Sequence, residues 1–121
     1  MKIQINSLRT FIGAKDFAIS RSFYNDLGFE EIVIDNNLSL FQKGEFGFYL
    51  QNYYARDWVE NTMLFLEVND VYKTFEELKQ ADLEREYTDL KISPVKKEVW
   101  GEVCFVHDPA GVLLHFAKVY K

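Results

Sequence analysis

Apolar and polar residues follow a pattern that occurs twice along the chain. Helix-spaced apolar residues lie within KDFAISRSFYNDLGF at 15–29 and again within NDVYKTFEELKQADL at 69–83. A short apolar run precedes each segment, and further strand-like runs follow it. A period of two is typical of half-buried strands, whereas a period near 3.6 indicates a helix. The pattern therefore predicts two copies of a strand–helix–strands module.

The first module is predicted to span about 1–54. Its expected elements are a strand at 7–12, a helix at 17–27 and strands at 29–35, 37–43 and 46–54. Asp16 is placed to cap the helix, and Gly28 is placed to end it in a left-handed conformation. The polar stretch at 55–61, around Trp58, is predicted to be a linker between the modules.

The second module is predicted to span 62–121. A strand at 63–68 leads to Asp70, the expected cap of a helix at 71–81, and strands at 102–107 and 112–119 flank a turn at 108–111. The poorly patterned stretch at 84–98 is expected to hold one strand, which Pro94 confines to an edge or a bend. At 121 residues the chain is predicted to form one domain, 1–121.

Side chains alternate across a strand, so residue parity divides each strand into two faces. The uniformly apolar faces, such as the one with Leu8 and Ile12, are expected to pack against the two helices. The mixed faces are expected to line a cleft between the modules, and they carry Arg9, Tyr49, Gln51, Met63, Glu67 and His115. The alternative is that these are ordinary solvent-facing positions of an α+β sheet.

Composition narrows the classes of function. Aromatic residues make up 17% of the chain, which favours rings that line a site as well as a core. The single Cys104 cannot form an internal disulfide and indicates a reducing compartment, so we expect a cytoplasmic protein. The net charge of −5 is spread along the chain and argues against a nucleic-acid partner. No apolar run has the length of a membrane span, so no membrane partner is expected.

The repeated helix segment, followed by WGEVCFVHDPAGVLLHF at 100–116, resembles the vicinal oxygen chelate superfamily, which includes glyoxalase I, bleomycin-resistance proteins and extradiol dioxygenases. The resemblance covers essentially the whole chain. It implies an α+β fold in which two βαβββ modules form a curved mixed-sheet cleft, commonly completed in a homodimer. FYNDLGF at 23–29 and LFQKGEFGFYL at 40–50 resemble the bleomycin-resistance branch in particular.

The resemblance also implies where a metal would lie. In the metalloenzymes of the superfamily the ligand positions correspond here to Arg9, Tyr49 (or Gln51), Met63 and His115. Of these, only His115 is a good ligand for a hard divalent metal, because Arg9 is cationic and Met63 is soft. Catalytic metal sites use about three protein ligands. We therefore expect no metal, no cofactor and no catalytic residue.

Other residues complete the predicted ligand-binding set. Trp58 and Trp100 are candidates to stack on a planar or cationic ligand, or else to pack at a dimer seam and at a sheet end. Phe41, Tyr53 and Phe65 are weaker candidates of the same kind.

Three further residues have open alternatives. Arg9 is expected either to form an ion pair with Glu67 or to clamp a ligand carboxylate or phosphate. His115 is expected to be a hydrogen-bonding residue that contacts Tyr49, with a general base or a remnant of a metal site as the alternative.

The predicted function is non-catalytic sequestration of a small aromatic or cationic organic molecule by a homodimer. The alternative is a metal-dependent lyase, isomerase or dioxygenase of the glyoxalase I type. A third hypothesis is a module that senses a small molecule or binds a protein partner.

Overall fold

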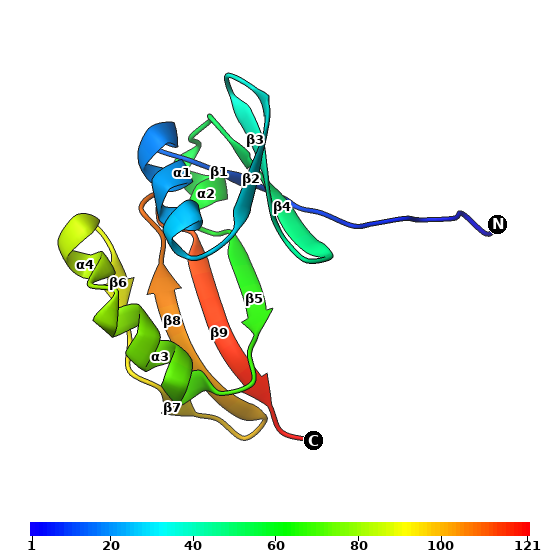
Figure 1. The fold of residues 1–121 in the computed structure, drawn as a ribbon. Helices are drawn as coiled ribbons and strands as arrows, with labels where there is room; N and C mark the ends of the chain where they lie inside the picture. The colour runs from blue at the N-terminus through cyan, green and yellow to red at the C-terminus, as the bar shows by residue number, and fades with distance from the viewer.

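The computed structural model describes all 121 residues and contains two modules, each with its own sheet (Figure 1). The N-terminal sheet has the strand order β1-β4-β3-β2, and the C-terminal sheet has the order β5-β9-β8-β6, with β7 paired to β8. In both sheets the first strand runs parallel to the last strand of the module, and the other pairs are antiparallel. The predicted mixed-sheet α+β fold is confirmed.

The elements of the first module are β1 (Phe11–Gly13), α1 (Phe17–Asp26), β2 (Glu30–Asp35), β3 (Leu38–Lys43) and β4 (Phe46–Gln51). Asp16 caps α1 by accepting a hydrogen bond from the Ile19 N–H, and Gly28 adopts a left-handed φ of 97° after the helix, as predicted. The fourth strand ends at Gln51 and not at residue 54, because the chain bends at Asn52 and the Tyr53 N–H donates to the Gln51 carbonyl in a tight turn.

The first strand is much shorter than predicted. Residues 1–10 form an extended arm that projects from the body of the molecule (Figure 1), and the strand begins only at Phe11. The Thr10 carbonyl accepts a hydrogen bond from the Tyr49 N–H, at 2.9 Å, which is the only backbone hydrogen bond between the arm and β4. Leu8 is fully exposed, so the expectation that it packs against a helix is wrong.

The second module contains β5 (Met63–Glu67), α3 (Val71–Gln80), α4 (Leu83–Glu86), β6 (Lys91–Ile92), β7 (Lys96–Lys97), β8 (Gly101–His107) and β9 (Leu113–Val119). Asp70 caps α3 through the Lys73 N–H, as predicted. The stretch at 84–98 holds two short strands and not one, because Pro94 separates them. The linker at 55–61 contains a short helix, α2 (Arg56–Val59), in which Val59 is fully buried.

One hydrophobic core of 19 buried residues runs through both modules. It includes Phe23 and Tyr24 of α1, Phe41 and Phe48 of the N-terminal sheet, and Leu114 of the C-terminal sheet. The Tyr24 and Phe48 rings are 4.8 Å apart in an edge-to-face arrangement. The two modules therefore share one continuous hydrophobic core.

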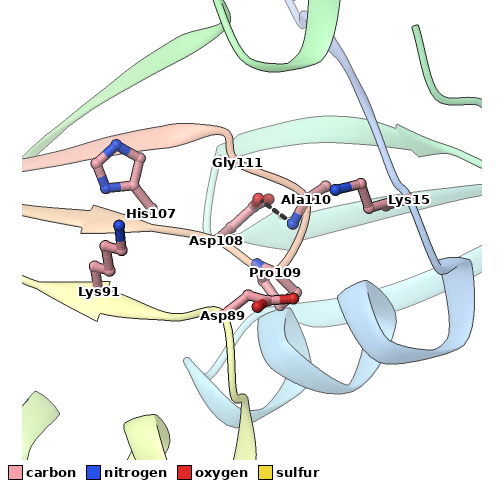
Figure 2. A pocket seen from close by; sticks show the side chains of 8 residues that line it. All are labelled: Lys15, Asp89, Lys91, His107, Asp108, Pro109, Ala110 and Gly111. Atoms are coloured by element: carbon pink, nitrogen blue, oxygen red, sulfur yellow. Dashed lines mark hydrogen bonds between the residues drawn. The ribbon is translucent and has the colours of Figure 1, made fainter. Parts of the chain in front are cut away.

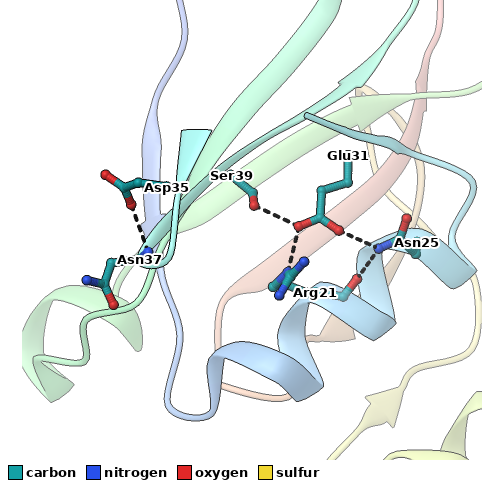
Figure 3. A network of polar contacts seen from close by, with 6 residues as sticks. All are labelled: Arg21, Asn25, Glu31, Asp35, Asn37 and Ser39. Atoms are coloured by element: carbon teal, nitrogen blue, oxygen red, sulfur yellow. Dashed lines mark hydrogen bonds and ion pairs between the residues drawn. The ribbon is translucent and has the colours of Figure 1, made fainter. Parts of the chain in front are cut away.

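A polar network attaches α1 to its sheet (Figure 3). Arg21 Nε and Ser39 Oγ donate to one oxygen of Glu31, at 2.6 and 2.7 Å, and Asn25 Nδ2 donates to the other at 3.2 Å. Burial opposes ionisation of Glu31, but these hydrogen bonds outweigh it and lower the pKa of Glu31. The ionised carboxylate therefore stabilises the contact between α1 and strands β2 and β3.

A second polar contact joins the two modules. The Tyr24 hydroxyl donates to Asp108 Oδ2 at 2.6 Å, while Asp108 Oδ1 accepts from the backbone N–H groups of Ala110 and Val112 at 2.8 and 2.9 Å. Burial raises the pKa of Asp108 and of Tyr24. The carboxylate thus organises the turn between β8 and β9 and ties that turn to α1.

No helix in the structure is long and apolar enough to cross a membrane.

Candidate functional site

Each sheet has one face covered by a helix and a second face that is open. The parity predicted for the strands is largely confirmed, since Leu50, Leu114 and Val112 are fully buried on the covered faces while Met63 and Phe65 are exposed. Ten of the eleven predicted ligand-binding residues lie on the open faces or at their ends: four in the first module, Trp58 in the linker and five in the second module. The exception is Phe41, which is fully buried between Tyr24 and Phe48, so its assignment to the site is corrected.

The open face of the C-terminal sheet is a cluster of aromatic side chains. The cross-strand register places Phe65 of β5, His115 of β9 and Phe105 of β8 in one row. The His115 ring lies 4.9 Å from the Phe105 ring, edge to face, and 6.1 Å from the Phe65 ring. Trp100 precedes β8, and its ring lies 6.0 Å from Phe65. Phe65 and Trp100 remain 54% and 41% exposed, which leaves their rings accessible.

His115 is the central polar group of this face. Its Nε2 lies 3.4 Å from the sulfur of Met63. Burial lowers the pKa of His115 below its usual value of 6.5, so the imidazole is neutral at pH 7. The predicted contact with Tyr49 is wrong, because Tyr49 belongs to the other sheet. The only carboxylate in the adjacent row of β5 is Glu67, which is exposed and has no ion-pair partner.

The open face of the N-terminal sheet carries a different set of groups. Phe11 and its register partner Tyr49 stack with their ring centroids 4.9 Å apart. Gln51 follows two residues after Tyr49 on the same side of β4. At the end of this face the Trp58 ring packs over Gly13. The centroid of the Tyr53 ring lies 6.1 Å from that of the Trp58 ring.

Arg9 lies on the N-terminal open face and not beside Glu67. Its Nε is close to Gly47 of β4, and its Nη1 donates to Ser7 Oγ at 2.8 Å. Arg9 precedes β1 of the N-terminal sheet, whereas Glu67 lies in β5 of the C-terminal sheet. No ion pair joins the two side chains. The predicted ion pair is therefore wrong, and the clamp on a ligand acid is the remaining alternative.

Sequence reasoning did not single out Phe11 or Phe105 as site residues. Parity alone had already placed Phe11 on the same face as Arg9. Phe105 becomes part of the site only because the turn at 108–111 sets the register that pairs it with His115. The alternation within VCFVH could have indicated its face, but not its neighbour.

The residues at the metal-ligand positions of the superfamily do not fit a hard divalent ion. Arg9 and Tyr49 lie in the first module, and Met63 and His115 lie in the second. An imidazole beside a thioether supplies one nitrogen and one soft sulfur, whereas Mn²⁺ or Mg²⁺ prefers carboxylate and water oxygens. No group of three or more His, Cys, Asp or Glu side chains is positioned to share a metal.

Two cavities lie elsewhere on the molecule. One, of about 260 Å³, surrounds the turn after β8 and is lined by Lys15, Asp89, Lys91, His107 and the 108–111 turn (Figure 2). The other, of about 400 Å³, lies between α1 and residues 86–89. Neither contains a predicted site residue. Asp108, at the base of the first cavity, already accepts hydrogen bonds from Tyr24 and from two backbone N–H groups.

No protein-family model and no curated protein matches the chain, but solved structures do. The chain is similar to a bleomycin-binding protein from the bleomycin-producing Streptomyces verticillus, complexed with copper(II)-bleomycin. The identity is 23%, 99% of this chain and 100% of that chain are covered, and the TM-score is 0.79. A bleomycin-binding protein complexed with bleomycin is 18% identical, with coverage of 96% and 100% and a TM-score of 0.78.

A fosfomycin resistance protein from Listeria monocytogenes, complexed with Mn(II) and sulfate, is 13% identical, with 97% of this chain and 93% of that chain covered and a TM-score of 0.69. At these identities the likeness establishes the fold. The chain has the fold of the bleomycin-binding proteins, as the sequence resemblance predicted.

Proposed function

We propose that this protein binds and sequesters a small organic molecule that has an aromatic or cationic part. The observation that carries the proposal is the open face of the C-terminal sheet, where Phe65, Phe105, His115 and Trp100 form one accessible aromatic surface. Exposed apolar patches with a few polar groups are typical of binding sites. Structures with the same fold are described as bleomycin-binding proteins, which supports ligand sequestration as the class of function.

The proposed mechanism needs no chemical step. The rings of Phe65 and Trp100 provide apolar and stacking contacts, and Glu67 offers a carboxylate to a cationic group at the same face. His115 is neutral and orients the ligand through a hydrogen bond. A bound molecule is withheld from its target for as long as it stays in the site, and it is released unchanged.

A homodimer is part of the proposal. The arm at 1–10 leaves the body of the chain (Figure 1), and its apolar side chains Ile3, Ile5 and Leu8 are 71–93% exposed. Ile3 and Ile5 alternate with polar residues, as in a strand that pairs on one side. In the proposed dimer residues 1–8 of one copy lie on the second copy, while Arg9 stays beside Gly47 of its own chain, and the open faces of the two chains border a shared cleft.

Ligand binding is tested by a thermal-shift screen over glycopeptide antibiotics, aromatic antibiotics, thiol conjugates and divalent metals. For any hit, we expect Trp100→Ala to weaken binding roughly 10–100-fold, as truncation of a buried aromatic anchor does. Trp58→Ala is also expected to weaken it more than His115→Ala, and Tyr72→Ala on α3 is the matched control. Conversion of the ligand to a product, with activity lost in His115→Ala, would contradict sequestration.

The dimer is tested by sedimentation of the full chain and of a variant that lacks residues 2–6. The full chain is expected at twice its 14.3 kDa mass, and the truncated chain is expected as a monomer with an unchanged core. A full chain that stays monomeric at tens of micromolar, or a truncated chain that still dimerises, would refute the role of the arm.

A further inference from the structure

Arg9 is a cation without an acidic partner. No carboxylate forms an ion pair with its guanidinium, and its only hydrogen bond goes to the neighbouring Ser7 hydroxyl. Its Nε is buried and donates to no acceptor. A buried polar group that lacks a partner is costly, and each such group calls for an explanation. The guanidinium therefore carries a positive charge that no acid of the chain neutralises, and an anion from outside the chain would neutralise it.

The backbone holds Arg9 at a defined place. The Tyr49 N–H donates to the Thr10 carbonyl as part of the parallel pairing of Phe11 with Tyr49, and two residues before that pair Arg9 lies beside Gly47. A Cβ at position 47 would lie 3.4 Å from Arg9 Nε and 2.9 Å from the Phe41 carbonyl oxygen. Glycine therefore leaves the space against β4 in which the guanidinium lies.

An aromatic surface lies next to the guanidinium on the same face. Phe11 and Tyr49 follow Arg9 and Gly47 by two residues, which corresponds to roughly 6.6 Å along a strand. Their rings stack 22° from parallel, and Phe11 is 46% exposed. A planar ring placed over Phe11 and Tyr49 would bring a substituent at its edge within reach of Arg9.

We propose that the N-terminal open face recognises an aromatic carboxylate, with the acid group bound by Arg9 and the ring on Phe11 and Tyr49. The planar guanidinium matches a carboxylate through paired N–H donors, an arrangement that a lysine ammonium cannot reproduce. This inference rests on the proposed binding function and deepens it, because it assigns an acid group to the ligand. The chain as a whole carries a net charge of −5, so recognition of an anion depends on Arg9 and not on the overall field.

The experiment compares three probes of equal size with the full-length protein by calorimetry: 2-naphthoate, neutral 2-naphthamide and cationic 2-naphthylmethylammonium. The naphthoate is expected to bind at least tenfold more tightly than either of the others. Arg9→Gln is expected to abolish that preference, and Arg9→Lys is expected to restore only part of it. The control is Arg56→Gln on α2, where the side chain is largely exposed outside this face, and its preference is expected to match the wild type.

The outcomes separate this inference from the function on which it rests. If the amide or the amine binds as tightly as the naphthoate, or if Arg9→Gln keeps the preference, the aromatic acid is wrong and the binding function stands. If the antibiotic screen gives ligands but none of the three probes binds, the aromatic acid is again wrong. If no compound of either set binds, both the inference and the proposed function fail.

Discussion

The hydrogen bond between Tyr24 and Asp108 is expected to contribute strongly to stability, because it joins α1 of the first module to the turn after β8 in the second. The change Tyr24→Phe removes one hydroxyl and leaves the aromatic packing intact. Asp108 then keeps its two backbone donors from Ala110 and Val112 but loses its only side-chain donor. Removing a hydrogen bond to a charged group costs about 2 kcal/mol.

This cost converts into a measurable shift in melting temperature. An unfolding entropy near 2.1 cal/mol/K per residue gives roughly 250 cal/mol/K for a chain of 121 residues, so a loss of about 2 kcal/mol lowers Tm by roughly 8 °C. The assay is urea unfolding followed by circular dichroism, together with a thermal scan. Tyr72→Phe is the matched control, because Tyr72 is 44% exposed on α3 and its hydroxyl makes no hydrogen bond within the chain.

Asp108→Asn tests the same reasoning from the other side. The amide oxygen can accept from both backbone N–H groups, and the amide nitrogen can donate to the Tyr24 oxygen. All three hydrogen bonds can therefore persist, with donor and acceptor exchanged in the one to Tyr24. The buried charge is also removed. We expect a loss of less than half that of Tyr24→Phe. A stability of Tyr24→Phe within about 0.5 kcal/mol of the wild type, or a larger loss for Asp108→Asn than for Tyr24→Phe, would refute this account.

Two further predictions concern titration. Hydrogen bonds hold the pKa of Glu31 below its ordinary value of 4.5, so its contribution to stability is complete above that pH and is lost as the pH falls through the lowered pKa. The difference in unfolding free energy between the wild type and Glu31→Gln should therefore shrink as the pH is lowered. A difference that does not change with pH would contradict the network. Burial and the hydrogen bond to Asp26 raise the pKa of Tyr87 to about 12. Tyrosinate absorbance should match that of Tyr87→Phe up to roughly pH 11, and an earlier difference would show that the Tyr87 hydroxyl is accessible.

The sequence by itself determined the local features of this protein. Strand parity follows from backbone geometry, so it correctly separated Leu50 from Tyr49 and Leu64 from Met63. The caps at Asp16 and Asp70 depend only on groups within three residues of each helix start, and both were predicted. The repeat of the pattern predicted two modules, and the family resemblance implied the mixed-sheet fold that they form.

Tertiary structure alone decided which of these local features meet. Parity assigns a side chain to a face but does not say which strand lies beside it, so the neighbours predicted for Arg9 and His115 were wrong. Phe41 was assigned to the site although α1 covers its face, and a strand was predicted at 7–12 although β4 pairs only with residues 11–13. Contacts between residues far apart in sequence, such as Tyr24 with Asp108, arise from packing of the whole chain, which no short window of sequence encodes.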